Sequence, residues 1–377
     1  MSRHGVTRVL PRRITPWFLL RAVAAGAALA RVGLAARRRP PLRAPSAPGT
    51  ATPDDGPTIS VVVPARDEAA RIGPLLDAVV GAPGVIEVLV VDDRSTDATA
   101  ELAAASGARV LPGIDTPPGW AGKAWALHQG LLAATSEWVV FLDADTRPSP
   151  ELPRALVRRA LAEHLDLVTV GGRFECPTAG ATWLHPAMLT TLVLRYGPSG
   201  RAGRVPRGRL LANGQCMAAR RGALLGIDGF RAVHDRVVED VALARFLDAH
   251  GWAVAMLDGG DLLTTRMYED LRGTWSGWGR SLALPGVEPR WRQAVDLTVL
   301  VCAQALPLPR LFARRADIVD VVLLAARLGT LVGTSPAYLR RGPAYWCSPL
   351  ADPVAVAAVA GNVIRPWRDW RGRSAPR

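Results

Sequence analysis

Continuous apolar runs alternate with helix-like patterns along the first part of the chain. The runs with the length of buried strands are ISVVVPAR (59–66), EVLVVDD (87–93), ARVLP (108–112) and WVVFLDAD (138–145). Between them, apolar residues recur at helical spacing in EAARIGPLLDAVV (68–80), ATAELAAAS (98–106) and KAWALHQGLLAAT (123–135). Strands that alternate with helices form βαβ units. The pattern therefore predicts an α/β fold, with a mostly parallel sheet flanked by helices.

The N-terminal apolar segment, TPWFLLRAVAAGAALARVGLAA (15–36), has about the length of one membrane helix. Arg21 and Arg31 interrupt it, and each would be costly at the centre of a bilayer. At roughly 100° per residue, both arginines lie on one side of the helix, with Leu19 and Val23 opposite. This placement favours a weak interfacial anchor over a clean membrane span.

Three further apolar segments follow residue 290: LTVLVCAQALPLP (297–309), IVDVVLLAARLGTLVGTS (318–335) and PVAVAAVAGNVI (353–364). They are read either as buried core helices or as membrane-embedded or re-entrant segments, and the second reading is favoured because arginine-rich connectors flank them. The predicted organisation is a basic N-terminal segment with an anchor (1–39), a linker (40–57), a catalytic domain (58–285) and a C-terminal hydrophobic, membrane-associated region (286–377).

Composition and net charge limit the classes of molecule that the protein could bind. The 377 residues are 49% hydrophobic and carry a formal net charge of +13, which suits either an anionic partner or the basic flanks of membrane segments. No nucleic-acid-binding motif is visible, so we expect no nucleic-acid partner. The four cysteines are far apart in the sequence, which indicates neither a zinc site nor a disulfide framework.

Polar clusters follow three of the predicted strands. They are Arg66-Asp67-Glu68, Asp92-Asp93 and Asp143-Ala144-Asp145. Open α/β sheets bind ligands at the carboxyl ends of their strands, so these clusters predict a site. The chain has neither a GxGxxG after the first strand nor a GxxxxGK[ST] motif, which disfavours a dinucleotide fold and a P-loop NTPase.

Asp143 and Asp145 lie two residues apart, so an extended backbone directs both carboxylates to one side. A hard divalent cation, Mg²⁺ or Mn²⁺, would let both stay ionised, and a solvated turn is the alternative. Glu239-Asp240 precedes a helical pattern and reads either as helix-stabilising charge or as a general base. Lys123 is the one lysine of the chain, and a compact charge at a helix start suits an anionic ligand.

Four motifs together carry a resemblance. VVVPARDEAARI, VLVVDDRSTDAT, FLDAD and VVEDVALARFLDAHGW, in that order, resemble the family 2 glycosyltransferases with the GT-A fold, over roughly residues 58–285. PPGWAGKAWALHQG (117–130) is similar to the membrane-associated subgroup near the carotenoid glucosyltransferases of the diaponeurosporenoate type and the hopene-associated glycosyltransferases. The resemblance implies a Rossmann-like GT-A sheet with hydrophobic membrane-associated helices at both ends of the chain.

The resemblance also implies roles for individual residues. Asp240 would be the catalytic base with Glu239 in support, and Asp145 would be the direct metal ligand with Asp143 beside it. The nucleotide-sugar would be bound by Pro64, Arg66, Glu68, Asp92, Asp93, Lys123 and Asp143. Residues on the acceptor and diphosphate side would be Arg266, Trp275, Trp278, Arg280, Asn213 and Gln215.

The activity implied is inverting, metal-dependent transfer of one sugar from a nucleotide-diphosphate donor. The acceptor would be a hydroxyl or carboxyl of a lipid such as a carotenoid, hopanoid, polyprenyl phosphate or glycolipid, at the cell membrane with the catalytic domain on the cytoplasmic side. The chain lacks a QxxRW motif, which favours single transfer over polymerisation. The alternatives are a nucleotidyltransferase of related fold and a catalytically inactive membrane scaffold.

Overall fold

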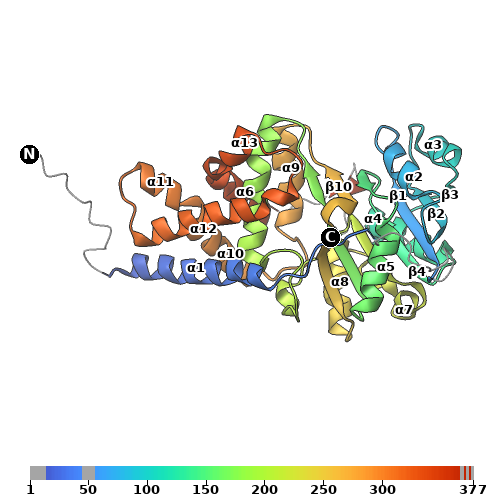
Figure 1. Ribbon diagram of the computed structural model, residues 1–377, viewed down its shortest axis with the longest axis horizontal. Coiled ribbons are helices and arrows are strands. Elements are labelled where there is room, and N and C mark those ends of the chain that lie inside the picture. Colours follow the sequence, from blue (N-terminus) through green and yellow to red (C-terminus); the bar gives the residue numbers. More distant parts are fainter. Residues whose placement is uncertain (1–13, 45–55, 366–368, 371–372, 375–377) are drawn as a thin grey trace, which may run out of the picture.

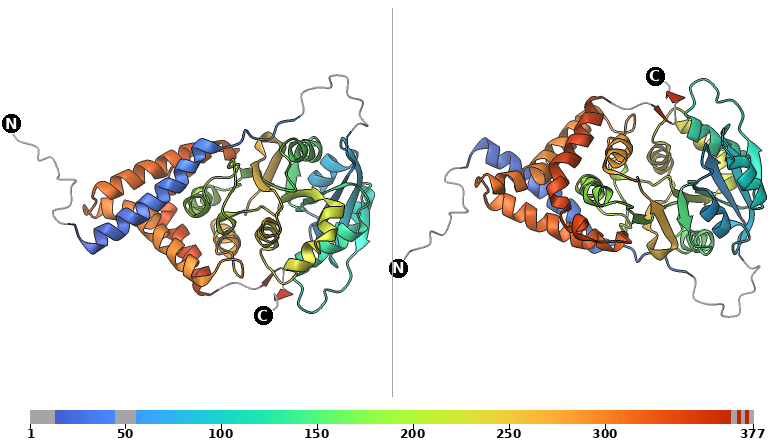
Figure 2. Two further views of the ribbon diagram at one scale, coloured as in Figure 1. Left: turned by 90° about the horizontal axis from the view of Figure 1, so that it is seen from below. Right: turned by 90° about the horizontal axis from the view of Figure 1, so that it is seen from above.

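The computed structural model describes residues 14–44, 56–365, 369–370 and 373–374, and these form two halves (Figure 1). The sheet half is built on a seven-stranded sheet. The helical half projects away from it, as all three views show (Figures 1 and 2). Its long helices are α1 (Pro16–Gly33), α6 (Ala179–Tyr196), α9 (Leu271–Leu282), α10 (Arg290–Leu300), α12 (Ile318–Thr334) and α14 (Asp352–Ile364).

The large sheet has the strand order β3-β2-β1-β4-β8-β6-β9. Neighbouring strands are parallel except at β8, which runs antiparallel to both β4 and β6. This arrangement confirms the predicted mostly parallel α/β sheet. The strands are β1 (Ile59–Ala65), β2 (Val85–Asp92), β3 (Arg109–Pro112), β4 (Trp138–Leu142), β6 (Leu167–Gly171), β8 (Cys216–Arg220) and β9 (Val254–Asp258).

A second, small sheet lies beside the ends of the large one, in the order β5-β10-β7. Its strands are β5 (Thr146–Pro148), β7 (Arg173–Glu175) and β10 (Leu263–Arg266). Because only three residues separate β4 from β5, the chain turns sharply at Asp143-Ala144-Asp145. The small sheet thereby keeps these carboxylates at the edge of the large one.

The strands are continuously apolar because helices cover both faces of the sheet. In β1, Val61 and Val63 point into one core with Leu75 of α2 (Gly73–Val79), whereas Val62 points into another with Leu127 of α4 (Gly122–Ala133). All of these side chains are buried. The remaining helices of the sheet half are α3 (Thr99–Ala105), α5 (Leu152–Ala162), α7 (Arg221–Gly226) and α8 (Glu239–Ala249).

The helix predicted over residues 68–80 begins only at Gly73. The backbone before it is held by the neighbouring loop instead. The Glu68 N–H donates to Oγ1 of Thr99 at 2.8 Å, and the Ala69 N–H donates to Oδ2 of Asp97 at 3.0 Å. These bonds tie the loop after β1 to the loop after β2, so the two strand ends keep a fixed relation.

The two arginines of α1 lie on one side of the helix, as their spacing predicts. In the structure this side faces the interior of the helical half. Arg21 is fully buried and contacts Asp317 at 2.7 Å and also Asp320, at the start of α12. Arg31 donates from Nη1 to the Leu194 carbonyl of α6 at 2.7 Å. The opposite side of α1 is exposed, with Val23 71% accessible. The charges that interrupt the apolar segment are therefore paired inside the helical half.

The predicted boundary at residue 285 does not separate the two halves in space. Helices α6 and α9 precede it in sequence, yet they share an apolar core with α1, α10 and α14. Leu42, in the predicted linker, is buried against the sheet half, and its N–H donates to the Asp258 carbonyl at 2.8 Å. Residues 45–55 of that linker lie outside the described part of the chain.

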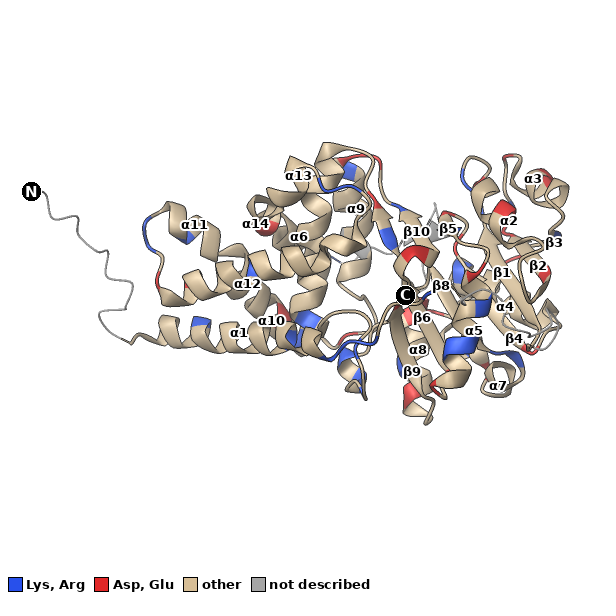
Figure 3. Ribbon diagram, in the orientation of Figure 1, with Lys and Arg blue, Asp and Glu red and all other residues tan. Residues whose placement is uncertain are grey.

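Two helices are long and apolar enough to cross a membrane by length and composition alone, Pro16–Arg37 and Ile318–Ala337. One or two such helices are weak evidence for a membrane protein. Charged residues are sparse along the helices of this half, as the tan ribbons of Figure 3 show. Its exposed large apolar side chains include Trp17, Leu19, Leu20, Val23, Leu311, Phe312, Val321, Val322, Leu328 and Val332.

Candidate active site

A cavity of about 1230 Å³ opens where the sheet half meets the helical half. At one end it is lined by the ends of β1 and β4 and by the starts of α4 and α8. At the other end it reaches α6, α9 and the end of α12. Predicted site residues that line it are Pro64, Glu68, Lys123, Asp143, Asp145, Asn213, Gln215, Glu239, Asp240, Arg266 and Trp278.

Asp143 and Asp145 occupy the turn after the buried strand β4. The Asp143 N–H donates to the Gln215 carbonyl at 3.1 Å, and the N–H and hydroxyl of Thr146 donate back to the Asp143 carbonyl. These hydrogen bonds fix the conformation of the turn. Both aspartates line the cavity, as their position at a strand end predicts.

Lys123, at the start of α4, lies between two carboxylates. Its Nζ is 2.8 Å from Oδ1 of Asp143 and 3.0 Å from Oε1 of Glu239. Burial by itself would lower the pKa of Lys123, but these two carboxylates raise the pKa well above its usual value. The ammonium group therefore stays charged and offsets the repulsion among the acidic residues of the site.

Asp240 lies at the first turn of α8, next to Glu239. Its Oδ2 accepts the Gly214 N–H at 2.7 Å, and its Oδ1 accepts the Val241 N–H at 2.7 Å. Burial, followed by the charge of Glu239, raises the pKa of Asp240 to about 7, although Lys123 and the two N–H donors oppose the shift. A carboxylate that titrates near neutral pH is suited to act as a general base.

Gly214 has a role that the sequence pattern did not reveal. A Cβ placed there would come 3.1 Å from Nζ of Lys123 and 3.2 Å from Oδ2 of Asp240. Glycine lets the backbone approach closely enough to hold the carboxylate of Asp240. Beside it, Asn213 donates to the Val170 carbonyl at 2.9 Å and to Gln215 at 3.1 Å, so these two cavity-lining amides are held in place.

Arg66, Asp92 and Asp93 lie at the neighbouring ends of β1 and β2 and do not line this cavity. Nη1 of Arg66 is 3.6 Å from Oδ2 of the buried Asp93. Asp92 accepts the Ser95 N–H at 3.3 Å, which gives it a part in the turn after β2. The hydrogen bonds from Glu68 and Ala69 to Thr99 and Asp97 hold the ends of β1 and β2 side by side, so these three residues lie next to the Pro64 end of the site.

The acceptor-side residues divide into two groups. Trp278 lines the cavity and packs against the buried His185, with 4.0 Å between ring centroids. Arg266 also lines it and pairs with Glu269 at 3.0 Å. Trp275 is 38% exposed and does not line the cavity. The side chain of Arg280 lies outside the described part of the structure.

A divalent cation at this site would need oxygen donors that face the cavity. Within the described residues, no group of three or more His, Cys, Asp or Glu side chains gathers to hold a metal ion. Asp143 and Asp145 nevertheless present carboxylate oxygens to one cavity. One or two carboxylates, completed by the phosphates of a substrate, are a common Mg²⁺ arrangement. The two aspartates fit a cation of that kind.

The family model for Glycosyl transferase family 2 matches residues 60–226. Residues 60–226 are a glycosyltransferase family 2 domain. The domain runs from β1 to the end of α7 and includes Lys123, Asp143 and Asp145. The match confirms the predicted family for these residues. Glu239 and Asp240 follow the matched range, so the fold, and not the family match, brings them to the site.

Curated relatives match this chain over a short stretch. The 4,4'-diaponeurosporenoate glycosyltransferase of Staphylococcus aureus strain bovine RF122 / ET3-1 is 38% identical over 89 residues, 23% of this chain and 24% of that protein. Its counterpart in strain USA300 is 39% identical over 88 residues, with the same coverage. The match therefore spans about a quarter of the length of these relatives.

Solved structures similar to this chain include glucosyl-3-phosphoglycerate synthase from Mycobacterium tuberculosis. Its complex with Mn²⁺, uridine diphosphate and glucosyl-3-phosphoglycerate has a TM-score of 0.42 and 27% identity, covering 65% of this chain and 86% of that one. The complex with Mn²⁺, UDP-glucose and phosphoglyceric acid has a TM-score of 0.43 and 26% identity, covering 66% and 85%.

Proposed function

We propose that the protein transfers a single sugar, with inversion, from a nucleotide-diphosphate donor to a hydroxyl or carboxyl group of a lipid acceptor. The observation that carries the proposal is the cavity, which joins the acidic end of the glycosyltransferase domain to the apolar helices of the other half. A charged donor and a lipid acceptor need these two environments at one reacting centre.

The donor would bind at the end of the cavity formed by the strand ends. Pro64 and Glu68 would contact the nucleoside, and Lys123 would face the diphosphate. Asp143 and Asp145 would hold a divalent cation, Mg²⁺ or Mn²⁺, which when bound neutralises part of the diphosphate charge. Because Lys123 also contacts Asp143, its positive charge lies directly beside the carboxylates that would hold the cation.

Asp240 would act on the acceptor. Its carboxylate takes the proton of the acceptor hydroxyl while the acceptor oxygen forms a bond to the anomeric carbon of the sugar. The bond between that carbon and the diphosphate oxygen breaks on the opposite side, and the nucleoside diphosphate leaves with the electron pair. Lys123 stabilises the charge that develops on the leaving group. For an acceptor carboxyl group that is already ionised, Asp240 would have no proton to remove.

The acceptor would enter from the helical half. Leu189, Leu192 and Val193 of α6 line the cavity, so an apolar chain would find an apolar wall there. The exposed apolar side chains of α1 and α12 would face lipid. These features support a protein at the cell membrane, and we propose that its catalytic domain lies on the cytoplasmic side.

The transfer is tested in detergent extracts of cells that contain the full chain. Radiolabelled UDP-glucose and other nucleotide sugars are supplied separately, and the lipids are separated by thin-layer chromatography. Asp240→Asn should abolish the labelling of a lipid that accepts the sugar on a hydroxyl group. Asp77→Asn is the matched control, since Asp77 is exposed on α2. Transfer by Asp240→Asn at the wild-type rate would rule out this base.

Donor binding is tested separately by titration calorimetry with UDP, with and without Mn²⁺. We expect the wild type to bind UDP more tightly with Mn²⁺, and Asp145→Ala to lose that gain. If the wild type bound no nucleotide under any condition, an inactive scaffold would be the better description.

A further inference from the structure

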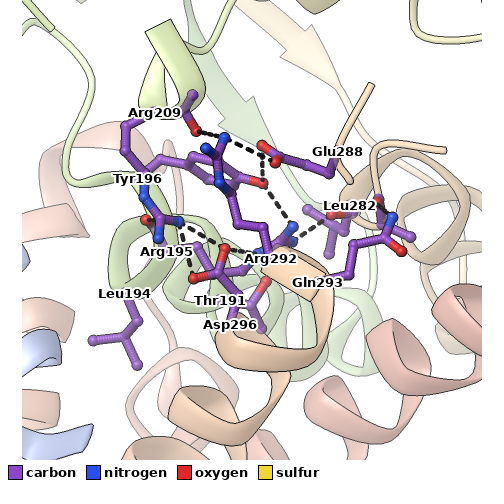
Figure 4. Close-up of polar contacts among 12 residues, drawn as sticks. Thr191, Leu194, Arg195, Tyr196, Arg209, Leu282, Glu288, Arg292, Gln293 and Asp296 are labelled. Carbon is purple, nitrogen blue, oxygen red and sulfur yellow. Dashed lines mark hydrogen bonds and ion pairs between the residues drawn. The ribbon is translucent and has the colours of Figure 1, made fainter. Parts of the chain in front are cut away.

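A group of charged side chains connects the two halves beside the cavity (Figure 4). Its members come from α1, α6, α8, α10 and the segments that precede β8 and α10. We call it the junction cluster, and it consists of Arg31, Arg195, Tyr196, Arg209, Arg245, Glu288, Arg292 and Asp296. The family match places no function there, and the proposed chemistry does not use it.

One part of the cluster surrounds Asp296 of α10. Nη1 of Arg209 lies 2.7 Å from its Oδ2 and 2.9 Å from its Oδ1. Arg31 approaches the same carboxylate to 3.5 Å and Arg195 to 3.8 Å. Asp296 is 1% exposed, so three guanidinium groups share one buried carboxylate.

The other part surrounds Glu288, which is also buried. Arg245 of α8 lies 2.6 Å from Oε1 of Glu288, and Arg292 lies 3.3 Å from Oε2. The Tyr196 hydroxyl donates to Oε1 at 3.3 Å and accepts from Nη2 of Arg195 at 2.6 Å, so it joins the two parts. Figure 4 shows Tyr196 and Arg195 beside Glu288, Arg292 and Asp296.

The cluster is not neutral. Five guanidinium groups face two carboxylates, which leaves three positive charges in formal excess among the described residues. Backbone carbonyls accept some of the remaining N–H groups, including those of Leu194 and Leu282, but they carry no formal charge. Buried charge is costly unless it is paired, and a purely structural network would be expected to balance. Because these guanidinium groups are at most 25% exposed, the excess of positive charge favours an anionic ligand beside them.

Arg209 and Tyr196 bring the cluster to the cavity, because both line it. Nη1 of Arg209 makes all of that side chain's hydrogen bonds in the described structure, two to Asp296 and one to the Arg195 carbonyl. Its Nε and Nη2 donors therefore remain for a ligand, and the side chain is 25% exposed. Nε of Arg195 is buried and likewise makes no hydrogen bond.

The site is connected to the proposed base by an apolar surface. Tyr196 packs in one cluster with Val238, Val241 and Leu284, and Val241 follows Asp240 directly. The segment from Arg209 to Gly214 also lines the cavity, and the N–H of Gly214 holds Asp240. A ligand held by Arg209 would therefore have an anionic group, an apolar neighbourhood and the reacting centre within one cavity.

We propose that Arg209, backed by the excess charge of the junction cluster, binds the anionic headgroup of an amphiphilic acceptor. A carboxylate or a phosphate monoester has the matching chemistry, because a guanidinium group offers parallel N–H donors to either. The assignment of this ligand as the acceptor rests on the proposed glycosyl transfer, whereas the anion site itself does not.

Binding is measured by calorimetry on the purified full chain in one nonionic detergent, without a sugar donor. The probes are dodecyl phosphate, dodecanoate, dodecanol and inorganic phosphate. Wild type should bind the two anionic amphiphiles more tightly than dodecanol. Arg209→Gln should weaken their binding by about 10- to 100-fold, the effect of hydrogen bonds to charged groups, and should leave dodecanol binding unchanged.

Arg207→Gln is the matched control. Arg207 lies in the same short helical turn, is exposed and pairs with Asp248 at 3.0 Å, so its loss removes one positive charge away from the cavity. Its binding constants should stay within about twofold of wild type. Arg209→Lys keeps the charge next to Asp296, and it should fold and bind the anionic amphiphiles with intermediate affinity.

Three results would overturn the proposal: equal weakening in both glutamine variants, equal affinity for dodecanol and dodecyl phosphate, or equal affinity for inorganic and dodecyl phosphate. The last would indicate a site for free anions. Failure of the proposed transfer would look different. Arg209-dependent binding of dodecyl phosphate, together with no labelled lipid from any nucleotide sugar, would support the anion site and refute the transfer.

Discussion

Replacing Asp240 by asparagine should stabilise the fold at neutral pH while it abolishes the proposed transfer. Burial and Glu239 raise the pKa of Asp240 from 3.8 to about 7. Each pKa unit corresponds to about 1.4 kcal/mol, so holding this carboxylate ionised costs the folded protein about 4 kcal/mol at high pH. Asparagine is similar in shape and carries no charge.

Part of that gain in the free energy of unfolding is offset by a lost hydrogen bond. The side chain of Asp240 accepts N–H groups from Gly214 and Val241, and an amide oxygen can satisfy only one of them. Leaving the other without its bond costs about 1–3 kcal/mol. A net stabilisation of about 2 kcal/mol remains, which corresponds to a rise in Tm of about 2–3 °C for a chain of 377 residues.

The difference in Tm between Asp240→Asn and wild type should depend on pH in a defined direction. Because the pKa is raised in the folded state, its contribution to stability is fully present below the unfolded pKa of 3.8 and is lost as pH rises through about 7. The Tm difference between Asp240→Asn and wild type should therefore grow from pH 4 to pH 7 and level off above. Thermal unfolding is followed by tryptophan fluorescence in detergent with EDTA, and Asp77→Asn is the control. A lower Tm for Asp240→Asn at pH 8, or a difference independent of pH, would refute the reasoning.

Three other predictions concern activity and the helical half. For a hydroxyl acceptor, kcat/KM should rise about tenfold per pH unit below about 7 and then level, because Asp240 must be ionised; a pH–rate profile checks this. Lys123→Met should lower kcat by about 10²–10³, measured by sugar transfer at saturating donor, because two carboxylates lose their buried cation. Arg21→Gln should destabilise the fold by about 3–5 kcal/mol in urea unfolding, since it leaves the buried Asp320 with less positive charge, whereas Arg37→Gln on the surface should change little.

Local pattern was sufficient for β1, β2, β3 and β4, the strands of the first part of the chain. Runs such as 59–65 and 138–142 are almost entirely apolar, as expected for strands that are covered on both faces. Strand ends in a parallel sheet share one edge, which is why Asp143, Asp145 and Pro64 could be expected to line one cavity. Helix 68–80 was predicted too long because the bonds from Thr99 and Asp97 come from another loop.

Contacts between distant segments could not be predicted. Arg21 and Arg31 were expected to weaken a membrane anchor, but their partners Asp320 and Leu194 come from α12 and α6. The excess of positive charge in the junction cluster is equally invisible in sequence, where arginines are spread along the whole chain. Its carboxylates, Glu288 and Asp296, stand out only because their neighbours in space are known.

By itself, the sequence determined the α/β class, the family of residues 60–226 and the acidic residues at the strand ends, because these depend on short-range periodicity and on motifs. The tertiary structure decided what lies between those charges. Lys123 contacts Asp143 and Glu239, Gly214 holds Asp240, and one cavity joins this centre to Arg209 and an apolar wall. Burial and pKa depend on which groups are brought together in space, so no local pattern contains them.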